Sequence, residues 1–357
     1  MTIRVPHNSG GMALIMAMIA IFVLSALAVG FALSMKVEAR LAQNADSEQQ
    51  LLWLGRSGVE LARYVLAQHP PGEPYDSLNQ RWAGGSGSMT ESNGVLSSLS
   101  LDNYPIGDGT VSVKIIDLDR KVNINTATAD VIQQALTTMG VDANNISVVS
   151  DSILDWIDAN DLPLPAGAES DYYQGLAVPY YAKNAPIDNL SELLLVKGVT
   201  PEMYWGSNAT NHTPSAFQHK LGLGTAPGQT PDYPFGLVDI FTPVSSGRIN
   251  INTADMNVLQ MIPGVDAAIA ADIIKQRAGP DGAEGTEDDI PYKNVNQLAT
   301  AGLNPQSLSQ AGNLCAVRSL VFEVHVNAQI GDYHREYVAI LYLNSLTDIR
   351  VVSFYWK

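Results

Sequence analysis

The stretch "GGMALIMAMIAIFVLSALAVGFALSMKVEA", residues 10–39, decides the architecture of the first part of the chain. From Met12 to Met35 it contains 24 residues without a charge. As a helix these residues would span about 36 Å at 1.5 Å each, enough to cross a hydrocarbon core of roughly 30 Å. A cleaved secretory signal, with Ala26-Leu27-Ala28 as its cleavage site, would have a shorter apolar region. The length therefore favours a helix that stays in the membrane.

The helical pattern continues past the apolar segment. Between residues 36 and 71, small or apolar side chains recur three, four or seven positions apart until Pro70-Pro71 ends the run. The sequence therefore predicts one helix of nearly 60 residues, which leaves the bilayer and packs through an apolar stripe. Members of this stripe include Leu52, Val59, Ala62 and Leu66.

A short polar leader with Arg4 precedes the apolar helix and ends in Gly10-Gly11. This arrangement resembles type IV prepilins and pseudopilins. The resemblance implies that a prepilin peptidase cuts between Gly11 and Met12 on the cytoplasmic side of the membrane, and that the new N-terminus is methylated. The leader would be removed, and the apolar helix would stay as an anchor and later serve in assembly.

One position departs from the pattern of these proteins. Most of them carry a glutamate at mature position five, which corresponds to Met16 here. In the family this carboxylate neutralises the N-terminal ammonium of the adjacent subunit, because an unpaired charge in an apolar spine costs several kcal/mol. A subunit without the carboxylate fits best at the tip of an assembly, where no subunit lies ahead.

Composition and charge exclude some functions for the rest of the chain. Of its 357 residues, 46% are hydrophobic and 7% aromatic, which suits a packed core. The formal net charge is −16, from 20 Lys and Arg against 36 Asp and Glu, so the surface repels phosphate backbones and attracts cations. The single cysteine, Cys315, excludes an internal disulfide and a Cys-rich zinc site.

Strand patterns occur on both sides of a long middle region. The run "GTVSVKIIDLD" (109–119) precedes that region. After it, residues 316–344 alternate on both sides of Ile330-Gly331-Asp332, which is a hairpin signal, and "DIRVVSFYWK" (348–357) supplies a final strand. Strands that bracket a region of different character predict an α+β fold.

The middle region contains a partial repeat. "KVNINTATADVIQQALTTMGV" (121–141) and "RININTADMNVLQMIPGV" (248–265) both run from an N-I-N-T turn through a short helix to Gly-Val, and "NLSELLLVKGV" (189–199) repeats the last part. We expect the Asn and Thr of each N-I-N-T to cap helices, and each glycine to make the tight turn between two helices. These are helix-hairpin-helix units.

Helix-hairpin-helix units elsewhere bind DNA through backbone N–H groups at the start of the second helix. Here Lys275 and Arg277 could assist on the second unit. The flanking loops, however, are acidic, which is a poor setting for a polyanion. Their carboxylates are Asp142, Asp151, Asp155, Asp158, Asp161, Glu284, Glu287, Asp288 and Asp289. We therefore expect no nucleic-acid binding.

A third feature is the run "DWIDANDLPLPAGAESDYY" (155–173). Together with the pilin helix that lacks the glutamate and with the two N-I-N-T hairpins, it makes the whole chain resemble the K-type minor pseudopilins of type II secretion. The resemblance implies a long N-terminal helix packed on a small antiparallel sheet, with a large inserted α-helical domain of SAM-like helix-hairpin-helix units. The implied division is a leader (1–11), a pilin helix (12–69), a pseudopilin core (70–120 and 312–357) and an inserted domain (121–311).

The resemblance also implies a function without an active site. The family member caps a periplasmic pseudopilus, is anchored in the inner membrane by one helix, and helps start the assembly that exports folded proteins across the outer membrane. Its implied partners are the I-type and J-type minor pseudopilins, the major pseudopilin, the prepilin peptidase and the inner-membrane assembly platform. Because pilin-like subunits join helix to helix, the predicted partner surface is the stripe of Leu52, Val59, Ala62 and Leu66.

Two other functions compete with this one. Competence-type DNA receptors also pair a membrane anchor with an N-I-N-T hairpin, but a basic hairpin surface would favour them and this sequence lacks one. An anchored hydrolase would show a Ser/His/Asp elbow, a zinc helix or a paired-carboxylate pocket, and none of these can be read in the sequence.

The stretch "GPDGAEGTEDDIPY" (279–292) indicates a cation site. Five carboxylates in nine residues repel one another unless solvent or a cation separates them, and the glycines allow the curvature that brings several oxygens to one centre. Hard oxygen donors without His or Cys favour calcium, although the spacing is not that of an EF-hand. The stretch resembles the D-G-x-x-G-T-x-D-D loops of calcium-binding surface proteins, and K-type pseudopilins are associated with calcium. A solvated acidic loop is the alternative.

The predicted calcium ligands are Asp281, Glu287, Asp288 and Asp289. A backbone carbonyl or a water would complete the shell. A second candidate group is Asp158, Asp161, Glu169 and Asp171.

Overall fold

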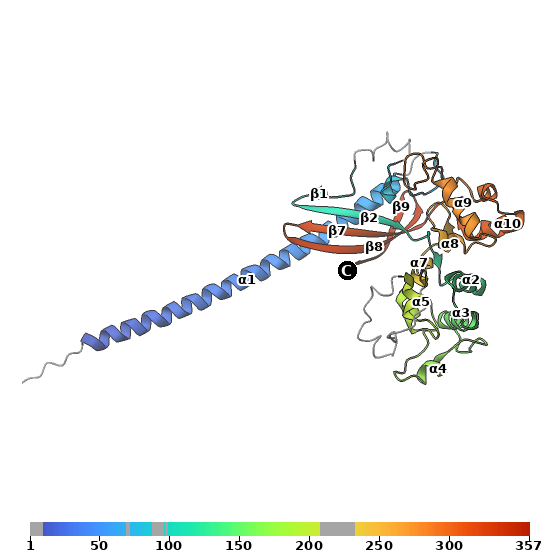
Figure 1. The fold of residues 1–357 in the computed structure, drawn as a ribbon. Coiled ribbons are helices and arrows are strands. Elements are labelled where there is room, and N and C mark those ends of the chain that lie inside the picture. The colour runs from blue at the N-terminus through green and yellow to red at the C-terminus, as the bar shows by residue number, and fades with distance from the viewer. Residues whose placement is uncertain (1–9, 69–71, 88–95, 97–98, 208–232) are drawn as a thin grey trace, which may run out of the picture.

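The computed structural model describes residues 10–68, 72–87, 96, 99–207 and 233–357. Figure 1 shows three parts: a long helix that projects as a rod, a sheet against the C-terminal part of this helix, and a helical domain beyond its end. Most of the predicted leader, residues 1–9, lies outside the described residues.

Helix α1 (Gly10–Ala67) is a single helix of 58 residues, as the sequence predicts. Its first part is exposed, and within the described residues it is the one helix that is long and apolar enough to cross a membrane. From Leu51 onward one side of the helix is buried. The helix ends at Ala67, close to the Pro70-Pro71 pair in the sequence. One helix thus supplies both a candidate anchor and the spine of the folded domain.

The sheet has five antiparallel strands in the order β1-β2-β7-β8-β9. The predicted hairpin is formed by β7 and β8, with Gly331 at its turn. Across the whole middle region, β2 pairs with β7, so that Lys114 lies opposite His325. The strands before and after the middle region form one sheet, which confirms the predicted α+β fold. The strands are β1 (Tyr104–Ile106), β2 (Gly109–Asp117), β7 (Val321–Ile330), β8 (Tyr333–Ser345) and β9 (Asp348–Trp356).

Helix α1 packs against one face of this sheet, mainly over β2 and β7. In this contact Val59, Ala62 and Leu66 are 3%, 0% and 4% exposed, and Leu52 is half-buried. The prediction that Val59, Ala62 and Leu66 bind partner proteins was therefore wrong, because the chain's own sheet covers them. For the half-buried Leu52 it stays a prediction. A periodic apolar stripe shows only that something covers it, and here the cover is intramolecular.

Two glycines let the helix approach the sheet closely. Gly55 faces the ring of Tyr337, and Gly58 faces the side chain of Val326. A methyl group added at either position would overlap these side chains. Because glycine inside a helix costs about 0.5–1 kcal/mol relative to alanine, the close contact explains why these two positions carry no side chain.

The helical domain consists of two similar lobes. Each lobe starts with a short strand that ends at the first asparagine of N-I-N-T, and continues through a pair of helices and a 3₁₀-helix to a helix that begins with proline. The first lobe has one more short helix before its 3₁₀-helix. The first lobe contains β3 (Val122–Asn123), α2 (Ala129–Met139), α3 (Ala143–Ile157), α4 (Ser170–Gln174), η3 (Leu190–Leu195), α5 (Pro201–Trp205), α7 (Leu237–Ile240) and β4 (Phe241–Thr242). The second lobe contains β5 (Ile249–Asn250), α8 (Met256–Leu259), α9 (Ala267–Arg277), η5 (Val295–Ala301), α10 (Pro305–Leu314) and β6 (Cys315–Ala316). A short parallel pair closes each lobe, and both lobes share one apolar core that is distinct from the core under α1.

The two N-I-N-T motifs make the same contacts in their lobes. In each motif the side chain of the first asparagine accepts a hydrogen bond from the backbone N–H of the second, Asn125 or Asn252. The side chain of Asn125 then binds both the N–H and the C=O of Ile187, and that of Asn252 binds both groups of Tyr292. The motif thus clamps an extended segment just before the 3₁₀-helix of its own lobe. The expectation that it caps helices was wrong, because the N-cap lies two residues beyond it in each lobe.

A buried carboxylate joins the sheet to the helical domain. Oδ2 of Asp117, the last residue of β2, accepts hydrogen bonds from the hydroxyls of Ser319 (2.6 Å) and Thr253 (2.5 Å) and from Nδ2 of Asn250 (3.2 Å). Burial, followed by the charge of Asp119, raises the pKa of Asp117 to about 7. The two chain segments that connect the sheet with the helical domain meet at this carboxylate.

We expect Gly58→Ala to destabilise the fold, although alanine is the better helix former. The added methyl group would force α1 away from Val326, at a cost of about 1–3 kcal/mol. Gly312→Ala is the matched control because Gly312 lies in α10 with open space around it, and alanine there should stabilise by about 0.5–1 kcal/mol. Thermal unfolding of the full chain in detergent measures both changes. Equal stability of the two variants would contradict the close contact.

Candidate functional site

Each lobe presents one helix-hairpin-helix unit, formed by α2 and α3 in the first lobe and by α8 and α9 in the second. The turn glycines, Gly140 and Gly264, are left-handed with φ of 87° and 81°. In both units an aspartate caps the second helix, and the carboxylates of Asp142 and Asp266 accept hydrogen bonds from backbone N–H groups of its first turn. A cavity of about 300 Å³ beside the turn of the second unit is lined in part by Asp130. The places where a DNA phosphate would bind therefore already carry carboxylates.

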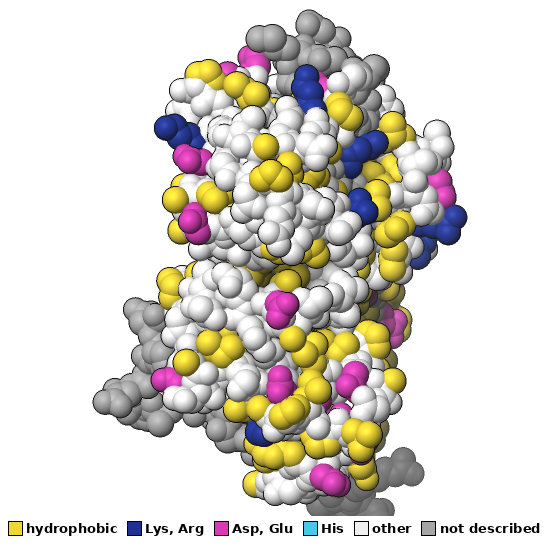
Figure 2. All heavy atoms as spheres, turned by 90° about the vertical axis from the view of Figure 1, so that its right-hand side faces the viewer, with side chains coloured by type: hydrophobic (Ala, Val, Ile, Leu, Met, Phe, Trp, Pro, Cys, Tyr) yellow, Lys and Arg dark blue, Asp and Glu magenta, His cyan; other side chains and the backbone are white. Residues whose placement is uncertain are grey.

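Arg277, suggested by the sequence as a DNA contact, is a buried structural residue. It is 3% exposed, and its guanidinium donates to the carbonyls of Ile251 (2.6 Å) and Ala254 (2.7 Å) and pairs with Glu284. The second N-I-N-T turn and the acidic loop after α9 are held together in this way. Arg277 is therefore not available for a phosphate. On the face turned away from the anchor, acidic and basic side chains are interspersed and no continuous basic surface is visible (Figure 2).

In the acidic loop 279–292, carboxylates accept hydrogen bonds from the loop's own backbone. Asp288 accepts a hydrogen bond from the N–H of Asp281 (3.2 Å), and Asp289 accepts one from another N–H of the loop (2.8 Å). Glu287 is exposed. In the described loop, no three of the four predicted ligands bring oxygens within 4.8 Å of one another. The calcium site at this loop stays a prediction.

Three carboxylates come together at the C-terminal end of α3 and the loop that follows it, at the equivalent place in the first lobe. Asp155, Asp158 and Glu169 each offer one oxygen within 4.8 Å of the others. Asp155 is fully buried, Glu169 is 3% exposed, and neither carboxylate oxygen of Glu169 accepts a hydrogen bond from the described residues. Asp158 and Glu169 belong to the second group that the sequence indicated. Of the other two members, Asp161 binds the backbone at the start of α4 and Asp171 is exposed.

The carboxylates of this cluster repel one another. Burial, followed by the charges of neighbouring aspartates, raises the pKa of Glu169 to about 7, and burial also raises the pKa of Asp155. The nearby ammonium of Lys197 donates to two carbonyls of the loop, at 2.9 and 3.2 Å, and so pairs with the backbone. Oxygen donors that are buried and carry excess negative charge form the ligand set of a hard divalent cation such as calcium.

Comparison with known proteins agrees with this architecture. The family model described as "Type II secretion system (T2SS), protein K" matches residues 111–206, and that described as "Helix-hairpin-helix motif" matches residues 244–315. Type II secretion system protein K of Pseudomonas aeruginosa is 24% identical over 97% of this chain and 92% of its own length. The proteins of the same name from Aeromonas hydrophila and Pectobacterium carotovorum subsp. carotovorum are 24% and 26% identical over 56% and 44% of this chain, and the matches span 61% and 48% of those proteins. The chain belongs to the type II secretion system protein K family.

The fold of this protein K family member also resembles a solved structure. One chain of the GspK-GspI-GspJ complex from enterotoxigenic Escherichia coli superposes on it with a TM-score of 0.61 at 19% identity, over 88% of this chain and 99% of that chain. The likeness in fold extends over nearly the whole chain. Within the described residues, the one helix that is long and apolar enough to cross a membrane fits a single-pass membrane anchor.

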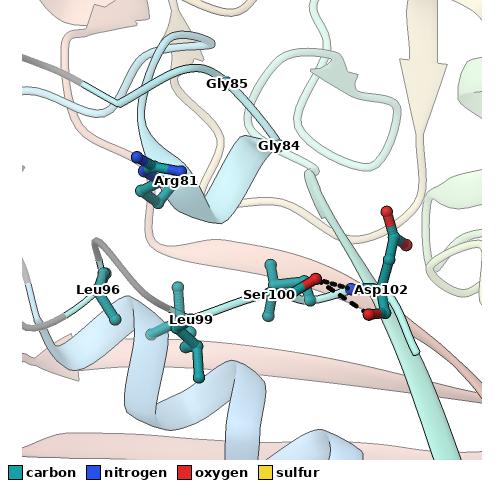
Figure 3. A pocket seen from close by; sticks show the side chains of 9 residues that line it. Arg81, Gly84, Gly85, Leu96, Leu99, Ser100 and Asp102 are labelled. Atoms are coloured by element: carbon teal, nitrogen blue, oxygen red, sulfur yellow. Dashed lines mark hydrogen bonds between the residues drawn. The ribbon is translucent and has the colours of Figure 1, made fainter. Parts of the chain in front are cut away.

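A further cavity in this protein K family member lies between α1, the 3₁₀-helix η1 (Arg81–Ala83) and the segment before β1. It measures about 220 Å³ and includes Arg81, Ser100 and Asp102 in its lining (Figure 3). The hydroxyl of Ser100 donates to the carbonyl of Asp102 (3.0 Å) and accepts from its N–H (3.1 Å), which is a local turn contact. Among the described residues, the lining includes no His, Cys or paired carboxylates.

Sequence reasoning missed Asp155 as a member of the cluster. Asp155 and Asp158 are three residues apart at the end of α3, a spacing that places two side chains on one face of a helix. This signal was present in the D-W-I-D run. Gly167 was also informative, because a side chain at this position would overlap the carboxylate of Asp155. The loop backbone must pass directly beside that carboxylate, and only glycine leaves the space.

Proposed function

We propose that this protein K family member is a minor pseudopilin of type II secretion, which caps the periplasmic tip of a pseudopilus and helps to start its assembly. The observation that carries the proposal is the position of the helical domain, which lies beyond the C-terminal end of α1 (Figure 1). In a bundle of parallel pseudopilin helices, this domain would occupy the space of a subunit stacked ahead. The apolar part of α1 adds a second argument, because Met16 stands where a glutamate would neutralise the ammonium of the next subunit.

The proposed partners at the tip are I-type and J-type minor pseudopilins. The fold neighbour from enterotoxigenic Escherichia coli was solved in a GspK-GspI-GspJ complex. On the side of α1 that faces away from its own sheet, Trp53 (57% exposed), Arg56, Glu60 and Tyr64 (44% exposed) form what we call the outer stripe. An exposed helical stripe with two large aromatic residues suits helix-to-helix packing. The major pseudopilin, the prepilin peptidase and the inner-membrane assembly platform are further proposed partners.

Negative charges on the outer stripe should weaken the complex. We expect Trp53→Glu combined with Tyr64→Glu, in the full chain co-expressed with I-type and J-type partners, to weaken binding about tenfold or more, because two aromatic anchors are lost. Size-exclusion chromatography of the detergent-solubilised complex, run over a dilution series, measures the change. Leu162→Glu, in the loop after α3, is the control because Leu162 is also exposed. If the wild-type chain binds neither partner, the proposed function fails; if the double variant binds normally, the interface lies elsewhere.

We also propose that a prepilin peptidase removes the leader. Gly11 lies in the first turn of α1, and among the described residues no side chain beyond its chain neighbours lies within 4 Å of the place where its Cβ would be. The mature chain should begin at Met12 with a methylated N-terminus, and Gly11→Val should block maturation. Mass spectrometry of the membrane-extracted protein measures the N-terminus. An N-terminus at Val29, after Ala26-Leu27-Ala28, would show cleavage by a signal peptidase instead.

We further propose that Asp155, Asp158 and Glu169 bind calcium, with loop carbonyls or water completing the shell. The contrast between the lobes supports this proposal. In the second lobe the buried guanidinium of Arg277 brings a positive charge to the acidic loop through Glu284. In the first lobe the three carboxylates lie together, and two of them have raised pKa values. A bound cation would supply in the first lobe the charge that Arg277 supplies in the second.

Millimolar calcium should raise the melting temperature of the full chain, because a ligand that binds only the folded state stabilises it. Glu169→Gln should abolish this increase, whereas Asp288→Asn combined with Asp289→Asn, in loop 279–292, is the matched control. Differential scanning calorimetry measures both. Loss of the increase in the double variant alone would place calcium at loop 279–292. Equal melting temperatures of the wild type with and without calcium would end the metal proposal.

The same cluster predicts a pH dependence without calcium. The carboxyl of Glu169 has its pKa raised from 4.5 to about 7 in the folded chain, so the folded state holds a proton that the unfolded state has released. As far as Glu169 is concerned, the free energy of unfolding should therefore be highest below about pH 4.5 and should fall as the pH rises to about 7. Calcium should remove this decline, since the cation replaces the proton.

A further inference from the structure

The two edges of the five-stranded sheet differ in their protection. At one edge, β1 is three residues long and contains Pro105, which limits pairing with another strand. At the other edge, β9 is nine residues long and contains no proline. Apart from its pairing with β8, β9 receives no backbone hydrogen bond from another described segment. Natural sheets usually protect such an edge, because its free backbone groups can pair with another chain.

The register shows which backbone groups of β9 face outward. The N–H of Lys357 donates to the carbonyl of Glu336 at 3.0 Å, so these two residues form a hydrogen-bonded pair of the antiparallel ladder. Hydrogen-bonded and non-hydrogen-bonded pairs alternate along such a ladder. Trp356 and Phe354 therefore sit in non-hydrogen-bonded pairs with β8. Their N–H and C=O groups point away from β8, towards the free edge.

The side chains at this edge are apolar and exposed. Val352, Tyr355 and Trp356 are 62%, 50% and 65% exposed, and Val352 is the unpaired residue of a β-bulge. Between Ile349 and Trp356, Arg350 is the one charged residue. A long edge with exposed apolar side chains is a template for strand addition, in which backbone hydrogen bonds give affinity and side chains fix the register.

This edge is continuous with helix α1. The guanidinium of Arg335 in β8 stacks on the ring of Trp356 at 4.9 Å and pairs with Glu48 of α1 at 3.3 Å. The ring of Phe354 stacks on that of Tyr337 at 5.4 Å, and Tyr337 lies against α1. A partner helix packed along α1 would therefore bring its own folded domain beside β9.

We propose that β9 accepts an extended strand from the minor pseudopilin that packs on α1, and that this strand becomes the sixth of the sheet. The inference rests on the proposed function, because it takes its occupant from the helix-to-helix complex. The outward N–H and C=O groups of Phe354 and Trp356 bind the backbone of the added strand. The side chains of Val352 and Trp356 contact its alternate residues and set its register.

Hydrogen exchange tests the proposal on the full chain in detergent, alone and in complex with the I-type and J-type partners. Amides in a peptide covering 349–357 should exchange about tenfold more slowly in the complex, because a paired edge opens less often. A peptide covering 104–106 should be unchanged, since β1 lies at the protected edge. Val352→Lys should weaken the complex about tenfold at an unchanged melting temperature, and Leu162→Lys, also at an exposed apolar residue, should not.

The outcomes separate this inference from the proposed function. A complex that forms without slower exchange over 349–357 overturns strand addition and leaves the tip proposal standing. A wild-type chain that forms no complex overturns both. Slower exchange over 349–357 that appears on concentrating the chain alone would identify a second copy as the occupant, and would overturn the assignment to a different pseudopilin.

Discussion

The buried carboxylate of Asp117 is the contact on which the arrangement of the molecule depends. It ends β2, yet its hydrogen-bond donors are Asn250 and Thr253 of the second N-I-N-T motif and Ser319, just before β7. A carboxylate removed from water without such donors would cost several kcal/mol, so each donor must stay in place. This requirement fixes the second lobe relative to the sheet, and the shared apolar core then fixes the first lobe relative to the second. The position of the helical domain beyond α1 follows from one polar junction.

The two lobes show how one backbone plan can carry different chemistry. Both are organised by an N-I-N-T clamp, both have an aspartate at the start of the second hairpin helix, and both have an acidic loop after that helix. In the second lobe the guanidinium of Arg277 lies between the N-I-N-T turn and the acidic loop, so this lobe supplies its own positive charge. In the described part of the first lobe, Asp155, Asp158 and Glu169 come together while the nearby ammonium of Lys197 donates to backbone carbonyls instead. The two lobes therefore differ in net charge at equivalent positions. The N-I-N-T motifs, which are the same in both lobes, do not show this difference.

Patterns with a long period or a clear alternation were predictable from the sequence. The helix α1 and the β7–β8 hairpin follow from local hydrophobic periodicity and from Gly331, and the structure contains both. What failed depends on contacts between distant segments. The buried stripe of Val59 and Leu66 has the same periodicity whether its cover is a partner or the chain's own sheet. The N-I-N-T asparagines bind segments 40 and 62 residues away, and local propensity for helix caps cannot anticipate this. Asp155 joins a cluster only because the loop returns to it at Gly167.

The insertion of one domain between two paired strands has a consequence for the order of folding. β2 and β7 are neighbours in the sheet, although Asp117 and Ser319, which meet at their junction, are 202 residues apart in the sequence. Closing a flexible loop of that size costs about 3 kcal/mol more in chain entropy than closing one of ten residues, and such non-local pairing is slow. A helical domain that folds first brings its two ends together and turns the pairing of β2 with β7 into a local event. An insert that folds first on its own core would therefore remove most of the loop-closure cost from the pairing of β2 with β7. The sheet would then form faster than it could around an unfolded loop.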